Sequence, residues 1–318
     1  MSNKLISIGE WDFVKDVEWI NASKILIGCS QDDAIGVYDS KTKTKSRIPY
    51  PKQLKAFHFR SFADRRFSPD GDIISVLASQ KDKNCYGFAS ISNESKLVLD
   101  KTFHFANGRP EVYQLPEHLF VTDENLHKLS FFDLSSWEET CVDIQLEPDN
   151  SLESEIFGVW PQSESKAILA RGDYRKTAVY ELAIKGPDCG KCIPIWSQDD
   201  IECIGVCANA NERTAVFFND LETYANVVIE IVGSKVFTFT YEEDPGVRPH
   251  PFYINDDLFF FPQENELSIL NVQGQRSEIV ADFKIDWGLI LAQRFGTEVI
   301  ALENSNFEVF LLDLGKSK

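Results

Sequence analysis

The phrase Gly36-Val37-Tyr38-Asp39 is the first of seven short, strand-like phrases that recur along the 318-residue chain. Each phrase places one polar residue within or after a run of apolar or small residues. The polar residues lie at 39, 90, 133, 181, 230, 271 and 313, so successive steps are 51, 43, 48, 49, 41 and 42 residues. The other phrases are Gly87-Phe88-Ala89-Ser90, Phe131-Phe132-Asp133-Leu134, Val179-Tyr180-Glu181-Leu182, Val228-Ile229-Glu230-Ile231, Ile269-Leu270-Asn271-Val272 and Leu311-Leu312-Asp313-Leu314.

A second mark precedes each phrase by about 16 to 21 residues. It is a small polar turn, such as Ser68-Pro69-Asp70-Gly71, and Asn, Asp, Pro and Gly favour tight hairpin turns. A continuous apolar run follows, such as Ile73-Ile74-Ser75-Val76-Leu77, which is typical of a strand covered on both faces. A repeat of turn and strands with a period near 46 indicates propeller blades. We therefore predict an all-β, seven-bladed β-propeller of four-stranded antiparallel blades.

Two segments also carry a family resemblance. The stretch Arg66-Phe67-Ser68-Pro69-Asp70-Gly71, followed by Ile73 to Ser79, resembles the first-to-second-strand signature of WD-repeat proteins. The stretch Val37-Tyr38-Asp39-Ser40-Lys41-Thr42 resembles the third strand of that repeat, with Tyr38 where the family has Trp. The resemblance extends over essentially the whole chain, with the second unit the most similar. It implies a WD-repeat-like propeller, which is a scaffold that carries many unrelated functions.

The repeat predicts a single domain over residues 1–318. Its blades are expected at about 10–50, 55–100, 103–145, 152–197, 200–241, 247–283 and 285–314. The last unit has one strand too few, and the segment at 4–8 is expected to supply its missing outer strand. Such a clasp between the termini removes the exposed sheet edges and closes the propeller.

The chain is acidic, with 32 basic and 50 acidic residues and a net charge of −18. This charge argues against direct binding to nucleic acid and to anionic membranes. It favours association with a basic protein partner, although solubility alone is an alternative explanation of the charge. Because the sequence has no long apolar span and no basic-then-apolar leader, we expect a cytoplasmic protein.

Four of the seven cysteines follow a C-x2-C and C-x3-C pattern: Cys189, Cys192, Cys203 and Cys207. Four thiolates are a ligand set for structural zinc. The second pair, however, is expected on the innermost strand of the fifth blade, and the first pair in a turn before an outer strand of the fourth. We therefore expect buried thiols and an ordinary turn rather than a metal site, and no cofactor.

Candidate partner-binding residues lie where loops meet the inner strands. Arg109 and Arg248 each precede a proline and an innermost strand, which would place them on the rim of the central channel, and His250 is also expected near the channel end of its blade. Rim arginines bind carboxylates or phosphates, or anchor a loop of a partner; the alternative is that they pair with a neighbouring blade. Tyr174 and Arg175 are typical interface anchors. Trp11 is expected either on the same face or packed against the clasp.

The sequence contains no nucleophile elbow, phosphate-binding glycine loop, dinucleotide fingerprint or zinc-protease helix motif. We therefore favour a non-enzymatic interaction scaffold or adaptor, which includes inhibitor and immunity-type roles. The alternative is a metal-dependent hydrolase or lyase, with His, Asp and Glu side chains that converge on the channel. A cluster of inward carboxylates would favour the enzyme, and exposed aromatic residues on the rim would favour the scaffold.

Overall fold

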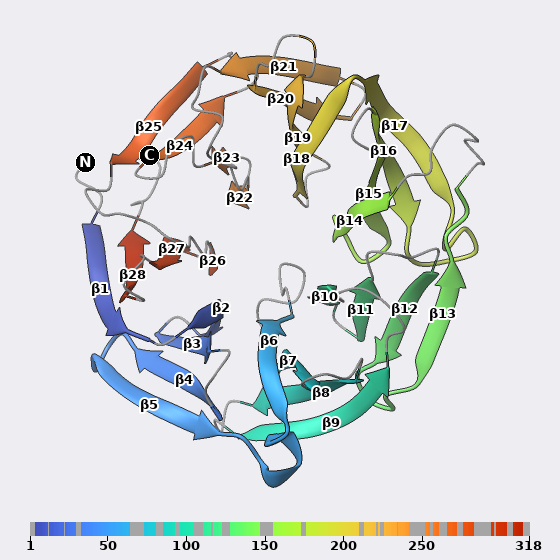
Figure 1. Cartoon of the computed structure of the whole chain (residues 1–318). Helices are drawn as coiled ribbons and strands as arrows, with labels where there is room; N and C mark the ends of the chain where they lie inside the picture. The colour runs from blue at the N-terminus through green and yellow to red at the C-terminus, as the bar shows by residue number, and fades with distance from the viewer. Residues whose placement is uncertain are drawn as a thin grey trace. The chain divides into compact units, whose positions relative to one another are not determined.

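The computed structural model describes most of the chain as β-strands (Figure 1). The described residues are 4–11, 13–21, 23–29, 33–63, 73–80, 85–92, 96–104, 111–115, 117–122, 128–146, 155–172, 176–209, 213–220, 222, 226–233, 235–241, 252–254, 257–260, 266–271, 276–282, 294–295, 297–303 and 308–313. Within these ranges the strands form seven four-stranded sheets, and the single helical element is a 3-10 turn at Lys52–Leu54. The predicted all-β class is confirmed.

The chain divides into two compact units. Unit 1 comprises residues 1–123, 131–140 and 285–318, and unit 2 comprises residues 124–130 and 141–284. The residues of the β10–β13 sheet are divided between them. The strands of this sheet, in order, are β10 (Glu111–Gln114), β11 (His118–Thr122), β12 (Lys128–Asp133) and β13 (Glu139–Asp143).

Unit 1 contains three complete sheets, two built of consecutive strands and one of the last three strands with the first strand of the chain. In the first, consecutive strands pair antiparallel throughout. The strands are β2 (Val14–Asn21), β3 (Lys24–Cys29), β4 (Ala34–Asp39) and β5 (Thr44–Pro49) in the first sheet; β6 (Phe57–Phe62), β7 (Ile73–Gln80), β8 (Cys85–Ser92) and β9 (Leu97–His104) in the second; and β26 (Arg294–Phe295), β27 (Thr297–Glu303), β28 (Glu308–Asp313) and β1 (Lys4–Glu10) in the third.

Unit 2 also contains three complete sheets with the same strand order. Each runs from its first strand to its fourth without a crossover. The strands are β14 (Glu155–Pro161), β15 (Lys166–Gly172), β16 (Lys176–Ala183) and β17 (Cys192–Asp199); β18 (Ile201–Ala208), β19 (Arg213–Asp220), β20 (Asn226–Val232) and β21 (Lys235–Tyr241); and β22 (Phe252–Ile254), β23 (Asp257–Phe260), β24 (Glu266–Asn271) and β25 (Arg276–Asp282).

Strand β1 lies beside β28 and completes the sheet of the last repeat unit (Figure 1). The register pairs Ile6 with Leu311 and is interrupted by a bulge between Ser7 and Gly9. Ile8, the extra residue of this bulge, packs in one apolar cluster with Val309. The N-terminal segment is therefore the outer strand of this sheet.

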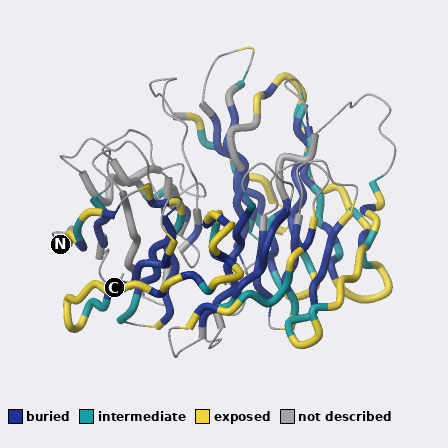
Figure 2. Tube along the Cα trace, turned by 60° about the horizontal axis from the view of Figure 1, so that its bottom comes forward, coloured by how far each residue is buried: buried dark blue, intermediate teal, exposed yellow. Residues whose placement is uncertain are grey.

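Burial follows the position of a strand within its sheet (Figure 2). Five of the six residues of β3 are buried, whereas five of the six residues of β5 are exposed. The difference follows from sequence, because β3 is a run of apolar residues and β5 contains Lys45 and Arg47. Continuous apolar runs suit strands covered on both faces, and charged residues suit edge strands.

Glycines allow aromatic rings to cross between elements of unit 1. A Cβ added at Gly28 of β3 would lie 2.1 Å from the ring of Phe59 on β6, and one added at Gly36 of β4 would lie 2.3 Å from the Trp11 ring. No side chain fits at such distances. The sheets β2–β5 and β6–β9 consequently share one apolar core, in which Phe59 and Leu26 are almost fully buried.

The first strands carry a repeated irregularity. In four sheets, the first strand has a residue with no partner on the second strand, which defines a β-bulge. These residues are Lys15 on β2, Arg60 on β6, Phe157 on β14 and Ile204 on β18, and β2 has a second bulge at Ile20.

Candidate functional site

Five of the six candidate partner-binding residues fall outside the described residues. Arg109, Tyr174, Arg175, Arg248 and His250 belong to this group. Their assignment to a binding surface remains a prediction.

Trp11, the sixth candidate, is 6% exposed. Its ring lies against Gly36, and the Lys45 ammonium is 4.6 Å from the ring centroid. It shares an apolar cluster with Ile8 of β1 and Val309 of β28. This environment matches the alternative in which the ring packs against the N-terminal strand, so we do not assign Trp11 to direct contact with a partner.

Cys189 and Cys192 flank a tight turn between β16 and β17. Gly190, between them, has φ +89°, and a Cβ there would lie 2.3 Å from the carbonyl oxygen of Asp143. The backbone N–H of Gln145 donates to the carbonyl of Gly190 at 2.7 Å, which fixes the turn against the end of β13. Burial raises the pKa of Cys192 to about 11, so this thiol is protonated at neutral pH.

Cys207, on β18, lies on the opposite face of its strand from Val206 and Ala208. Its neighbours Val206 and Ala208 pack in a cluster with Ile168 and Val179 of the β14–β17 sheet. Cys207 itself packs with residues of its own sheet and with Tyr253 and Leu258 of the β22–β25 sheet. Side chains alternate between the two faces of a strand. Cys207 therefore points away from the sheet that carries Cys189 and Cys192, and the four-thiol set is not brought together.

Among the described residues of unit 2, the most buried charged group is Glu230, on β20, with 0% exposure. Arg213 of β19 forms an ion pair with Glu230 Oε1 and also donates from Nε to the same oxygen at 2.7 Å. The hydroxyl of Tyr253, on β22, donates to Glu230 Oε1 at 3.2 Å. The Glu230 carboxylate thus joins the sheets β18–β21 and β22–β25 across an otherwise apolar boundary.

This environment also changes the ionisation of Tyr253. Burial is the largest cause, and Cys207 and Glu230 add to it, raising the pKa of Tyr253 well above its ordinary value. The phenol therefore stays protonated and remains a donor to Glu230. The guanidinium of Arg213, 5.8 Å from the centre of the Tyr253 ring, acts in the opposite direction.

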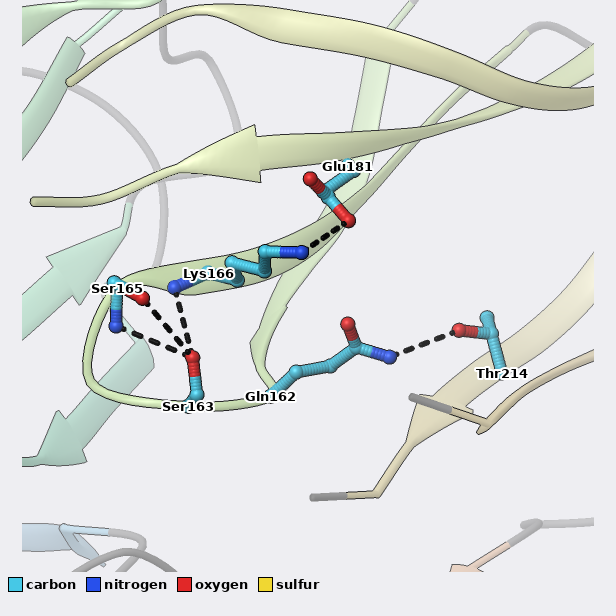
Figure 3. A network of polar contacts seen from close by, with 6 residues as sticks. All are labelled: Gln162, Ser163, Ser165, Lys166, Glu181 and Thr214. Carbon is cyan, nitrogen blue, oxygen red and sulfur yellow. Dashed lines mark hydrogen bonds and ion pairs between the residues drawn. The ribbon is translucent and has the colours of Figure 1, made fainter. Parts of the chain in front are cut away.

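A second polar network lies in the β14–β17 sheet and reaches β19 (Figure 3). Lys166 of β15 pairs with Glu181 of β16 at 3.1 Å. The amide of Gln162, at the end of β14, donates to the hydroxyl of Thr214 on β19 at 3.3 Å and so links two neighbouring sheets. Ser163 Oγ accepts from the backbone N–H of Lys166 at 3.1 Å and closes the intervening turn.

Two aspartates of the recurrent phrase close turns by accepting hydrogen bonds from the backbone. Asp39 Oδ1 accepts from the backbone N–H groups of Lys41 and Thr42, and Asp133 accepts in the same way from Ser135 and Ser136. Hydrogen bonds from Ser135 and Ser136 hold the pKa of Asp133 well below its usual range. These carboxylates have a local structural role.

Within the described ranges, no group of three or more His, Cys, Asp or Glu side chains is placed to hold a metal ion. Among the same residues, no helix is long and apolar enough to cross a membrane.

The sequence analysis did not single out Lys15 and Arg60. Both are exposed and occupy the bulges of β2 and β6. No local motif marks a bulge in these strands, so only the register of the paired strands shows it.

Comparison with solved structures identifies the fold. A chain of the mitotic checkpoint complex matches with a TM-score of 0.62 and 13% identity, over 98% of this chain and 90% of that chain. YCF48 bound to a D1 peptide matches with a TM-score of 0.67 and 9% identity, over 99% and 97%. The hydrazine synthase of Kuenenia stuttgartiensis matches with a TM-score of 0.64 and 12% identity, over 96% of each chain.

These neighbours are β-propeller proteins, so the likeness shows a β-propeller fold. At such low identity the likeness establishes the fold alone. No protein-family model and no curated protein matches the chain.

Proposed function

We propose that this protein is a non-enzymatic interaction scaffold, built as one closed propeller of seven blades, that binds a protein partner through the loops at one end of its blades. The contacting residues are Arg109, Arg248, His250, Tyr174 and Arg175. We further propose that this partner is basic, because the net charge of −18 favours fast association with a basic protein.

The fold supports an interaction role. β-Propellers present loops from several rigid blades, and binding residues on loops are commonly positioned by such a scaffold. Two of the similar structures concern assemblies by their names: one is a propeller bound to a peptide, and the other belongs to a checkpoint complex. The pairing of β1 with β28 supports closure, since this strand comes from the opposite end of the chain.

The test compares partner capture by charge-reversed variants. We expect Arg109→Glu with Arg248→Glu to weaken capture of the partner by tenfold or more, because rim arginines that anchor a carboxylate would become repulsive. The matched control is Lys41→Glu with Lys55→Glu, which reverses two exposed lysines and changes the net charge equally. The bound partner would be quantified against the wild-type protein at fixed salt.

Equal losses in both double variants would show a general charge effect and would reject the two arginines as anchors. An unchanged capture with a lower melting temperature of Arg109→Glu/Arg248→Glu would support a structural role for them. If no partner is captured by the wild-type protein and hydrolysis or elimination appears on adding a divalent metal, the enzyme alternative replaces the scaffold.

A further inference from the structure

Two strands of unit 1, β2 and β6, each carry an exposed basic residue in a protein whose net charge is −18. Lys15 and Arg60 are both exposed, and each is the extra residue of a bulge in the first strand of its sheet. In the corresponding bulges of unit 2 the residues are Phe157 and Ile204. The two cations of unit 1 are therefore not required by the bulge itself, since apolar residues occupy the same position elsewhere.

Asp16 places the two bulges next to each other. Its Oδ2 accepts from the backbone N–H of Phe62 on β6 at 2.9 Å, and its Oδ1 accepts from the N–H of Val17 at 2.9 Å. Lys15 is one residue from Asp16 and Arg60 two residues from Phe62. The bulges that carry Lys15 and Arg60 therefore lie on two adjacent strands, β2 and β6, which the Asp16 carboxylate links.

These cations are available to a ligand. Within the part of the chain that the structure describes, Lys15 forms no hydrogen bond or ion pair, and Arg60 forms one hydrogen bond, to the hydroxyl of Ser79. By contrast, Lys166 and Arg213 of unit 2 are each paired with a glutamate. Among the described residues, neither Lys15 nor Arg60 is paired with a carboxylate.

An exposed aromatic residue precedes Lys15 closely in the sequence. Phe13 lies two residues before Lys15, and 43% of its surface is exposed. Its backbone φ is +52°, a conformation that non-glycine residues rarely adopt and that is found disproportionately at binding sites. Aromatic and arginine side chains are also the types that most often dominate the energy of an interface. Phe13, Lys15 and Arg60 together are called the β2–β6 patch.

We propose that the β2–β6 patch binds a short acidic peptide segment of a partner, with glutamate or aspartate side chains on Lys15 and Arg60 and an apolar side chain on Phe13. Charge complementarity selects this occupant, since the two free cations suit carboxylates. A long polyanion is disfavoured because the acidic remainder of the protein repels it. A short peptide is repelled less, because at physiological salt charges more than about 8 Å away are largely screened from it. This proposal goes beyond the proposed function, which concerns a basic partner bound at the loops. The β2–β6 patch is a different surface, and its ligand is acidic.

The experiment measures binding of a fluorescein-labelled peptide, Gly-Ser-Glu-Glu-Leu-Glu-Glu-Ser-Gly, to the full chain by fluorescence anisotropy. We expect saturable binding, weakened roughly tenfold by Lys15→Gln with Arg60→Gln. Phe13→Asn removes the aromatic ring but keeps a residue that tolerates positive φ, and it should weaken binding about threefold. The control Lys41→Gln with Lys55→Gln removes the same charge from exposed residues and should bind as the wild type does.

Two further peptides separate the contributions. Replacing each Glu by Gln should abolish binding, and replacing Leu by Ser should remove the effect of Phe13→Asn. Failure of the acidic peptide to bind at about 1 mM, or equal binding by the patch and control variants, would overturn the proposal. The result is independent of whether a basic partner is captured at the loops, so the failure of one proposal is distinguishable from the failure of the other.

Discussion

The sheets β14–β17 and β18–β21 each have an ion pair at equivalent positions, but the two pairs differ in their environment. In the first, Lys166 is opposite Ala183 and Glu181 opposite Ile168; in the second, Arg213 is opposite Val232 and Glu230 opposite Ala215. Both pairs therefore run diagonally between the second and third strands, from a basic residue at the start of the second strand to the recurrent polar position of the third.

Their burial differs greatly. The side chains of Lys166 and Glu181 are 39% and 31% exposed, whereas those of Arg213 and Glu230 are 16% and 0% exposed. Tyr253 of the next sheet donates to Glu230, and the other oxygen of this carboxylate, Oε2, is buried without a hydrogen-bond partner among the described residues. The comparison teaches that a repeated position can keep its pairing while its energetic importance changes with its neighbours.

The largest effect should come from Arg213→Met. This change leaves Glu230 as an uncompensated buried charge and should lower the free energy of unfolding by about 3–5 kcal/mol. Urea unfolding followed by tryptophan fluorescence measures the change. The matched control is Arg213→Met with Glu230→Leu, which removes both charges and should recover most of the loss. If the double variant is as unstable as Arg213→Met, the unpaired Glu230 carboxylate is not the cause of the loss in the free energy of unfolding.

A smaller effect should come from Tyr253→Phe, which removes one hydrogen bond to the carboxylate. We expect a loss of about 1–2 kcal/mol near neutral pH, because the remaining acceptor stays buried. The raised pKa of Tyr253 adds a pH dependence. The folded state binds this proton more tightly than the unfolded state, so its stabilising contribution is complete below pH about 10 and decreases as pH rises above that value.

Unfolding midpoints measured between pH 8 and 11.5 check this dependence. The wild-type protein should lose stability more steeply above pH 10 than Tyr253→Phe does. Parallel profiles for the two proteins would show that Tyr253 is not the group responsible.

The smallest effect should come from Lys166→Met. Its partner Glu181 remains partly in contact with water, and exposed pairs contribute about 0–1 kcal/mol. We expect a change below about 0.5 kcal/mol in the same urea experiment, and less at 1 M salt. A loss comparable to that of Arg213→Met would break the comparison and would show that burial does not set the importance of the pair.

The repeat made the strand positions predictable. The recurrent phrases with Asp39, Glu181 and Glu230 fall on β4, β16 and β20, which are the third strands of their sheets. The predicted outer-strand segment at 4–8 lies within β1, which pairs with β28. These features depend on local or periodic patterns, so they can be predicted from a single sequence.

The roles of individual side chains were less predictable. The sequence marks Asp133 and Glu230 as equivalent, yet one closes an exposed turn and the other is buried against Arg213. The shorter aspartate reaches its own turn, whereas the longer glutamate reaches the neighbouring strand. Lys15 and Arg60 were missed because a bulge depends on the pairing of two strands rather than on one segment.

The most direct test of the interaction scaffold is affinity capture from native lysate with the wild-type protein at about 50 mM and 500 mM salt, analysed by mass spectrometry. The account predicts a stoichiometric basic protein that is retained at low salt and depleted at high salt, because screening shortens the reach of the acidic surface. Capture of no stoichiometric partner at either salt concentration would contradict the account.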